Sequence, residues 1–277
     1  MYRILFTIGS FRIYSYGVMV ALAFITAILL AMKEAKRSGE NPERVLDISL
    51  YVILGALIGG RLGYIIFHLD YYLENPIKIL YFRQGGLAFL GSFILAFILG
   101  AWYVSRNKLS FWKYTDIAAP SVAIGIGIGR IGCFLNGCCY GLVSEKYGLK
   151  FPALDMPPVY LQQLNDGLIA SGSSYTLPVI PTQIYSSLFD GFIIFFILHW
   201  MKKYKKYDGF LMLSFFILYS ISRFNIEFFR FYENNFKVFN LLTTTQTILL
   251  GVVLVSLVSM NILKKKNKNS GQKNSKK

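Results

Sequence analysis

Acidic side chains, histidines and cysteines are scarce in this sequence. Its 277 residues include 14 Asp and Glu against 29 Lys and Arg, with only two histidines and three cysteines. The cysteines, Cys133, Cys138 and Cys139, are too few for a disulfide framework, and no histidine stands at zinc-ligand spacing beside them. We interpret them as small polarizable packing residues, and we expect neither a metal nor an organic cofactor.

A cleavable leader and an internal repeat are also missing. The opening MYRILFTIGSFRIYSYG has no small-residue cleavage site after a short apolar core, so we expect the first apolar run to stay in the protein. No internal repeat is visible in the sequence, which weakens an interpretation as an inverted-repeat transporter.

Apolar residues dominate instead. The chain is 55% hydrophobic and 17% aromatic, with a mean hydropathy of +0.48, which is too apolar for a soluble domain of this size. Apolar runs of about 18 or more residues are typical of spanning helices. We predict an all-α polytopic membrane protein whose seven transmembrane helices lie near 14–32, 46–69, 86–104, 115–140, 183–201, 209–230 and 242–263.

The positive charges predict the orientation. With the N-terminus outside, the segments facing the cytoplasm hold 18 Lys and Arg and the outer segments hold 7. The positive-inside rule therefore places the N-terminus out and the C-terminus in. Residues 1–263 would form a single transmembrane domain with 141–182 as an extracytoplasmic cap, and 264–277 would be a disordered basic cytoplasmic tail. Loops and tail explain the basic charge, so we expect no nucleic-acid partner.

Four arginines lie inside the apolar runs: Arg61, Arg130, Arg223 and Arg230. An arginine at the centre of a spanning helix costs about 2.5–3.5 kcal/mol on insertion scales. Counted from the cytoplasmic helix ends, the first three each rise about 21–23 Å through a hydrocarbon core about 30 Å thick. We expect them at one level in the outer half, where guanidinium groups would bind the phosphate of a phospholipid bidentately.

A structural role stays open for these arginines. Glu227 follows Arg223 by four residues, so the two share a helix face in a polar stripe with Tyr219 and Arg230. Arg61 could lock the bundle in a similar pair, and Arg230 could simply extend to the outer interface.

The stretch APSVAIGIGIGRIGCFLNGCCYG surrounds Arg130 with glycine. Gly127, Gly129 and Gly132 spell a dinucleotide-binding fingerprint, but that pattern requires a preceding strand in a βαβ unit, and here it lies in a membrane span. Gly125, Gly129 and Gly132 lie on one helix face, as do Gly137 and Gly141, and small residues at this spacing permit close helix packing. They also leave space around Arg130 for a bulky headgroup. Asn136 adds a neutral donor and acceptor nearby.

The segment GRIGCFLNGCCYG (129–141) resembles the defining segment of bacterial prolipoprotein diacylglyceryl transferase. Further motifs follow in that family's order, from residue 16 to 230: Tyr16-Gly17, GGRLGYIIF (59–67), GGLAFLG (85–91), Asp116 with Pro120, PTQIY (181–185) and LYSISRFNIEFFR (218–230).

The resemblance implies a seven-helix enzyme of the bacterial plasma membrane. Such an enzyme moves the diacylglyceryl group of phosphatidylglycerol to the thiol of the lipobox cysteine in a prolipoprotein signal peptide. It forms a thioether and releases glycerol phosphate, in the first step of lipoprotein maturation. Residues 1–263 would then be its catalytic domain.

Carried over residue by residue, the resemblance makes Arg130 the phosphatidylglycerol-binding position. Further functional positions match Tyr16, Asn136, Gly141, Tyr219, Arg223 and Glu227. We assign catalysis to Arg130, Arg223, Glu227, Tyr16 and Tyr219. We assign phosphatidylglycerol binding to Arg130, Arg61, Asn136, Gly141 and Arg230.

The chain departs from the family's pattern at four positions. Leu90 stands where the family often has histidine, Cys133 where asparagine is common, Cys138 where glutamate is common and Ser186 where glutamate is usual. The proton acceptor is therefore open between Glu227 and a substitute base. His68, at the outer end of the second run, could replace the missing base, although a lone interfacial histidine is usually solvated. His199 lies at the cytoplasmic end of its run, too far from the site.

Two other classes compete with the transferase. One is an organic-anion transporter or channel with an arginine-lined site, and the other is a non-catalytic lipid-binding scaffold.

Overall fold

The computed structural model describes residues 3–9, 11–74, 76–80, 86–232, 237–238 and 241–274. Gly85 of the GGLAFLG motif and residues 275–277 of the predicted tail lie outside the described residues. The long helices are α1 (Ser15–Arg37), α2 (Pro42–Phe67), α4 (Phe89–Arg106), α5 (Phe111–Asn136), α8 (Ile194–Met201), α9 (Phe210–Glu227) and α10 (Thr244–Asn274). The shorter elements are α3 (Leu69–Glu74), η1 (Pro76–Leu80), α6 (Pro158–Asn165), α7 (Thr182–Ser186), η3 (Ser187–Ile193), η4 (Lys202–Tyr204) and the strands β1 (Ile4–Ile8), β2 (Phe11–Tyr14), β3 (Lys237–Val238) and β4 (Leu242–Thr243).

Within the described ranges, seven helices are long and apolar enough to cross a membrane, which confirms the predicted polytopic helical fold. The fifth is continuous from Thr182 to Tyr204, through α7, η3, α8 and η4. Each observed span overlaps its predicted run, with ends displaced by a few residues. The orientation of the termini stays a prediction.

The last helix, α10, continues past its predicted end. Residues 264–274, for which the sequence predicts disorder, prolong it as helix. Once a helix is nucleated, each further residue adds one backbone hydrogen bond, and the apolar part of α10 supplies the nucleus. The Asn267 side chain also donates a hydrogen bond to the Lys206 carbonyl at 3.0 Å, which holds the extension to the segment before α9.

A β-hairpin precedes α1, where the sequence analysis expected no strand. Strands β1 and β2 pair antiparallel, and Gly9 between them has a φ of +59°. The residues nearest the turn, Phe6-Thr7-Ile8 and Phe11-Arg12-Ile13, alternate between apolar and polar on either side of Gly9, as is typical of such hairpins. The backbone N–H and the hydroxyl of Ser15 both donate to the Arg3 carbonyl, so the hairpin closes against the first turn of α1.

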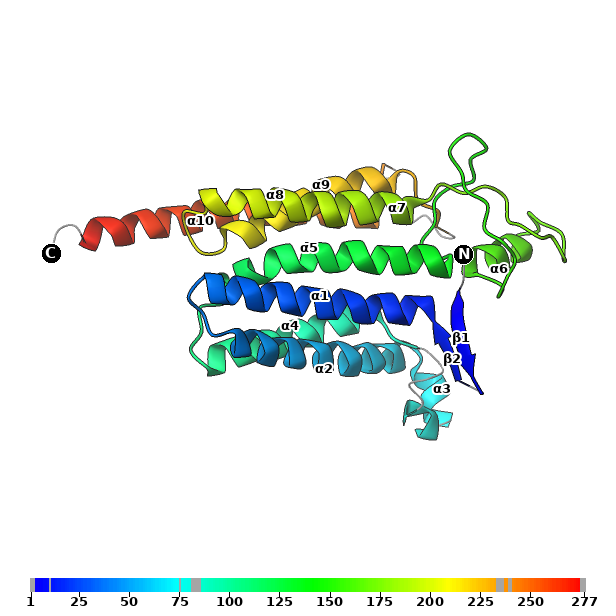
Figure 1. Ribbon diagram of the computed structural model, residues 1–277, viewed down its shortest axis with the longest axis horizontal. Coiled ribbons are helices and arrows are strands. Elements are labelled where there is room, and N and C mark those ends of the chain that lie inside the picture. The colour runs from blue at the N-terminus through cyan, green and yellow to red at the C-terminus, as the bar shows by residue number, and fades with distance from the viewer. Residues whose placement is uncertain are drawn as a thin grey trace. The chain divides into compact units, whose positions relative to one another are not determined.

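The chain forms two compact units, one of residues 1–29 and 118–277 and the other of residues 30–117. In the first unit, the later part of α5 runs beside α8 and α9, and α10 packs on α9 (Figure 1). The buried core there consists of Ala119, Ala123, Ile194, Leu198, Leu211 and Phe215. Small alanines on α5 against large side chains on α8 and α9 let these helices approach closely.

Glycines make the closest contact between α5 and the helix formed by α7, η3 and α8. A Cβ on Gly127 would lie 3.2 Å from the Cα of Gly191, and the Ser187 hydroxyl donates to the Gly127 carbonyl at 2.8 Å. Gly132 packs in the same way on Met19 and Tyr16 of α1. Gly132 therefore has the packing role predicted for it, and Gly127 has one that was not predicted, both inside a continuous helix rather than after a strand. A Cβ on Gly129, predicted to pack with Gly132, would meet nothing within 4 Å among the described residues.

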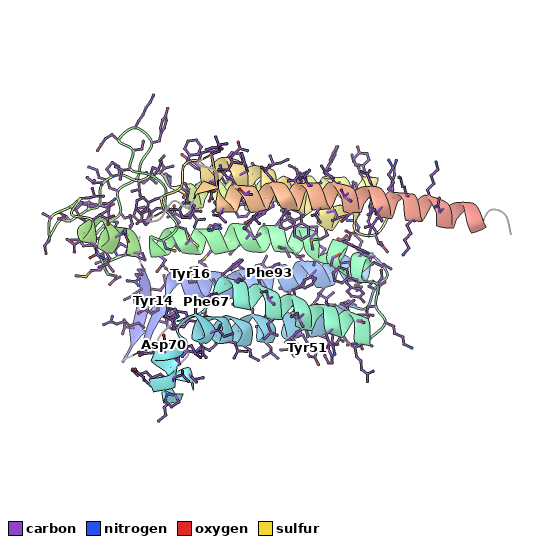
Figure 2. The ribbon with its side chains drawn as sticks, turned by 180° about the vertical axis from the view of Figure 1, so that it is seen from behind. Tyr14, Tyr16, Tyr51, Phe67, Asp70 and Phe93 are labelled. Carbon is purple, nitrogen blue, oxygen red and sulfur yellow. The ribbon has the colours of Figure 1, made fainter. Side chains whose placement is uncertain are left out.

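In the second unit, α2 and α4 pack along a stripe of small residues. Gly55, Gly59 and Gly63 recur every four residues on α2 and face the backbone of α4 around Gly91 and Ala96. The large side chains of Phe67 and Phe93 are exposed (Figure 2), as a surface covered by lipid requires.

We predict that Gly59→Val destabilises the protein by about 1–3 kcal/mol, because the new side chain overpacks this contact. A Cβ at Gly59 would collide with the Gly91 carbonyl and lie 2.6 Å from the Leu95 Cβ. The measurement is the unfolding free energy in detergent micelles. Gly251→Val is the matched control, because a Cβ at Gly251 of α10 meets nothing within 4 Å. Equal effects of the two changes would contradict the prediction.

Candidate functional site

Arg130 lies near the C-terminal end of α5 and is partly buried. Among the described residues, its guanidinium group makes no hydrogen bond and no ion pair. It interacts electrostatically, at longer range, with Cys133, Tyr219, Cys139 and Asp190. A guanidinium group that is desolvated and unpaired in a membrane helix is costly, so this side chain is available for an anionic ligand.

Arg223 and Glu227 are in contact on α9, as their spacing predicts. Arg223 Nη2 lies 2.9 Å from Glu227 Oε2, and both side chains are buried. The same Arg223 nitrogen donates to the Tyr232 hydroxyl at 3.3 Å, and the Thr243 hydroxyl donates to Glu227 Oε1 at 3.3 Å. The pair is therefore held from both sides, and the position of the Arg223 guanidinium is defined by its neighbours.

Sequence reasoning missed Tyr232 and Thr243, because both lie outside the helix whose pattern it used. Burial, together with a hydrogen bond to Glu227, raises the pKa of the Tyr232 phenol above its ordinary value. The phenol therefore stays protonated at neutral pH and keeps its place in the Arg223–Glu227 network.

Asp190 is a buried acid that sequence reasoning also missed. It lies in η3, a π-helical turn of the fifth span. The Ser222 hydroxyl of α9 donates to Oδ1, whereas Oδ2 is buried without a hydrogen-bond partner in the described part of the chain. Its carboxylate interacts electrostatically with both Arg223 and Arg130. An acid inside the run SLFDGFIIFF is itself a signal, because acids in spanning helices are rare and functional by default.

Asp190 thus lies within the electrostatic range of two arginines from two helices of the first unit. Arg223 has a carboxylate of its own in Glu227, and Arg130 has none among the described residues. The two arginines that the sequence assigns to one site therefore differ in their surroundings.

Arg61 belongs to the second unit and is buried. Its guanidinium donates to the carbonyls of Lys78 at 2.6 Å, Ile79 at 2.9 Å and Gly86 at 3.3 Å, and lies 5.3 Å from the Tyr72 ring centroid. These contacts favour the structural alternative, since they tie the segment after α3 to α2. Lipid binding by Arg61 stays a prediction.

Tyr16 lies in the first turn of α1, just after Tyr14 at the end of β2 (Figure 2). Its side chain is 43% exposed, and it interacts electrostatically with Arg130. Tyr219 of α9 stacks on Phe215 with 5.7 Å between ring centroids. The structure therefore brings both predicted tyrosines into the electrostatic surroundings of Arg130.

Asn136 is the last residue of α5. Its side-chain oxygen accepts a hydrogen bond from Arg3 Nε at 3.3 Å. Arg3 also donates to the carbonyls of Asp155 and Met156, at 3.0 and 3.1 Å. The N-terminal hairpin is thus connected through Arg3 to the end of α5 and to the segment 141–182.

Gly141 occupies a position that tolerates no side chain. A Cβ there would collide with the Phe229 carbonyl and lie within 2.9 Å of Thr182 and Ile180. Its N–H donates to the Ile180 carbonyl at 2.8 Å, and it forms an antiparallel bridge with Arg230. Arg230 is therefore fixed beside Gly141 through its backbone, and its guanidinium lies 5.3 Å from the Tyr232 ring centroid.

Residues 141–182 are folded and have a small core of their own. Phe151, Val159 and Val179 are buried and pack against Phe134, in the last turn of α5, and Tyr140, which follows the helix. The segment contains α6, and isolated bridges join Val143 and Leu149 to Val179. Its packing on α5 places it over the helix end that carries Arg130.

The family model described as "Prolipoprotein diacylglyceryl transferase" matches residues 3–262 of this chain. A phosphatidylglycerol–prolipoprotein diacylglyceryl transferase of Clostridium tetani is 32% identical over 262 residues, covering 95% of this chain and 98% of the relative. The enzyme of that name from Francisella tularensis is 34% identical over 275 residues, covering 95% of each chain. One from Clostridium botulinum is 32% identical and covers 97% of this chain and all of the relative.

These similarities favour the transferase over the organic-anion transporter and the lipid-binding scaffold, since every relative named here is a transferase.

We predict that Glu227→Gln lowers the free energy of unfolding by about 3–5 kcal/mol, because it leaves the buried Arg223 without a countercharge. The measurement is denaturation in mixed micelles. Glu145→Gln, at an exposed position of the segment 141–182, is the matched control. If both variants have the same free energy of unfolding as the wild-type protein, the ion pair does not stabilise the fold.

Proposed function

Because this chain belongs to the prolipoprotein diacylglyceryl transferase family, we propose that it transfers the diacylglyceryl group of phosphatidylglycerol to the lipobox cysteine of prolipoproteins. The cysteine sulfur forms a bond to the glycerol carbon, the carbon–oxygen bond to the phosphate breaks, and glycerol phosphate leaves. The thiol proton passes to an acceptor. We place the reaction in the bacterial plasma membrane, where both the lipid and the signal peptide are found.

One observation carries this proposal: the Arg130 guanidinium has no protein partner in the described residues, although it lies partly buried near the end of a membrane helix. A phospholipid phosphate supplies the missing negative charge and matches the planar fork of two N–H donors. Binding the headgroup would therefore satisfy a group that the folded protein leaves unsatisfied.

The chemistry follows from charge. A free thiol has a pKa of about 8.5, so it must lose its proton before it attacks. Positive groups fixed near the reacting atoms favour the thiolate and offset the charge on the departing phosphate. We assign the phosphate to Arg130 and the developing charge to Arg223, which Glu227 orients.

The remaining assignments concern the headgroup. The hydroxyls of Tyr16 and Tyr219 would donate to phosphate or glycerol oxygens. Asn136 and Gly141 would shape the headgroup site at the end of α5, with Arg230 at its edge. We keep Arg61 among the residues that contribute to lipid binding, but its proposed role is indirect: it holds the segment after α3 against α2 in the second unit.

The proton acceptor has two candidates in the first unit. Leu90 has no basic group. Glu227 is engaged by both Arg223 and Thr243. Asp190 Oδ2 and Glu227 Oε2 are both buried without a hydrogen-bond partner among the described residues. Glu227 Oε2 is ion-paired with Arg223, whereas Asp190 interacts with the arginines only at longer range, which favours Asp190 as the group that takes the proton.

We predict that Arg130→Lys abolishes nearly all transfer, because a point charge cannot reproduce the guanidinium fork. The measurement uses purified protein, phosphatidylglycerol vesicles and a lipobox peptide, with mass spectrometry to detect the diacylglyceryl adduct. A Cys→Ser peptide controls for the site of attachment. Arg12→Lys, at an exposed position of β2, is the matched control and should transfer normally.

Two outcomes of this assay have different meanings. A lack of adduct with the wild-type protein would refute the reaction. Normal transfer by a well-folded Arg130→Lys protein would refute only the phosphate assignment.

We further expect His68→Gln to leave turnover and its pH profile unchanged. His68 is exposed, stacks on Tyr64 with 4.1 Å between ring centroids, and has its Nδ1 3.0 Å from the Tyr64 carbonyl. These local contacts and its exposure support the interpretation of His68 as a solvated interfacial residue and not as the base. A pH profile displaced in the His68→Gln protein would instead identify this histidine as the missing base.

A further inference from the structure

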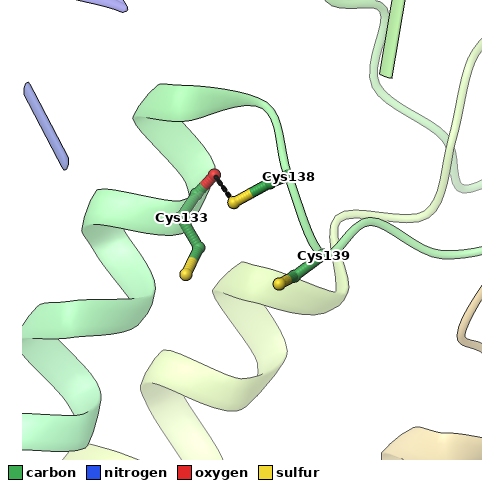
Figure 3. Close-up of side chains that lie close together, drawn as sticks. All are labelled: Cys133, Cys138 and Cys139. Carbon is green, nitrogen blue, oxygen red and sulfur yellow. Dashed lines mark hydrogen bonds between the residues drawn. The ribbon is translucent and has the colours of Figure 1, made fainter. Parts of the chain in front are cut away.

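Three thiols gather at the end of α5 that carries Arg130 (Figure 3). The sulfur atoms of Cys133, Cys138 and Cys139 all lie within 4.8 Å of one another, and none forms a disulfide. Cys133 is buried and the other two are partly buried. The sequence suggests packing residues, because no histidine stands beside the three cysteines. Spacing along the chain does not reveal that their sulfur atoms converge in one small volume.

The helix cap brings Cys138 back over Cys133. Gly137 has a φ of +72°, and its N–H donates to the Phe134 carbonyl at 3.2 Å, while the Cys138 N–H donates to the Cys133 carbonyl at 3.1 Å. This is the Schellman pattern that ends helices at a left-handed glycine. The Cys138 thiol also lies 3.7 Å from the Cys133 carbonyl. The cap therefore sets two of the three sulfurs side by side.

Backbone contacts then fix Cys139. Its φ of +61° is in the left-handed region, which is uncommon for a residue with a side chain and needs surrounding structure to hold it. The buried side chains of Gln183 and Thr182 donate to the carbonyls of Cys138 and Cys139, at 2.7 and 2.8 Å. The backbone that carries the third thiol is thus held in place by side chains of α7.

Positive charge surrounds this cluster. Cys139 interacts electrostatically with Arg230 and Arg130. Guanidinium groups at this range offset the negative charge that several thiolates in one place would carry. The cluster therefore has the two properties that a thiolate metal site requires, converging sulfurs and charge compensation.

We propose that Cys133, Cys138 and Cys139 bind one thiophilic metal ion, for which Zn²⁺ is the probe. Soft thiolate ligands select ions of this class. Zinc–sulfur bonds of about 2.3 Å place tetrahedral sulfur ligands roughly 3.8 Å apart, so the observed cluster needs only small side-chain rotations. Binding replaces the thiol protons by the ion, and a fourth position stays open for water. The proposal does not depend on the transfer reaction.

The test uses the full chain in detergent, treated with a phosphine reductant and freed of metal. Titration with Co²⁺ should show one equivalent bound per chain, with sulfur-to-cobalt charge-transfer absorption, and one equivalent of Zn²⁺ should displace it. Zn²⁺ should also raise the unfolding temperature, because a ligand bound only by the folded state stabilises it.

Cys138→Ser and Cys139→Ser should each lower the affinity at least about tenfold and remove most of the charge-transfer band. Cys133→Ala tests the buried position. The matched control is the double variant His68→Gln with His199→Gln, which removes both histidines of the chain and should bind like the wild type. Unfolding temperatures without metal show whether each cysteine variant is folded.

Three results would overturn the proposal. The first is a reduced wild-type chain with three titratable thiols and no sulfur-to-cobalt band. The second is a band that persists in a folded cysteine variant. The third is a chain that keeps only one titratable thiol under reducing conditions, because the cluster would then be a disulfide pair.

Discussion

A positive charge inside an apolar layer must find a countercharge, a set of dipoles or a ligand, and this constraint organises the arginines of the protein. Arg223 finds the Glu227 carboxylate at 2.9 Å, and Arg61 finds three backbone carbonyls. Arg130 makes no ion pair and no hydrogen bond among the described residues, and Asp190 acts on it only at longer range. All three are arginines inside apolar runs of the sequence, and only Arg223 has an acid, Glu227, one helical turn away. Their surroundings separate those that hold the fold from the one left for a substrate.

Close helix packing supports this arrangement in the first unit. The contact between Gly127 and Gly191 brings α5 against the fifth span, at the π-helical turn that buries Asp190. π-Helical turns inside helices are frequent at functional sites, because the extra residue redirects neighbouring side chains. Here the redirected group is a carboxylate whose charge reaches both Arg130 and Arg223. Packing and electrostatics therefore converge on the same turn.

The spans were predictable because apolar runs of membrane length have few alternative structures, and the 129–141 motif made the family recognisable. The pairing of Arg223 with Glu227 was also predictable, since it depends only on helix geometry. The contacts of Arg61, the place of Tyr232 and the gathering of three thiols were not. Each depends on backbone directions at helix ends and on residues far apart in the chain, which periodicity does not encode. The N-terminal hairpin had a local signal in Gly9, but the apolar background concealed it.

The segment 141–182 leaves and returns to the helical framework at a single point. The Gly141 N–H bonds to the Ile180 carbonyl, and the Ile180 N–H bonds to the Leu142 carbonyl at 2.9 Å. The two ends are thus paired like the base of a hairpin, and everything between them is an insertion whose closure cost grows only slowly with length. The length of this region can therefore change while α5 and α7 keep their positions, provided that the glycine at the junction and the packing of Phe151 and Val159 on Phe134 are retained.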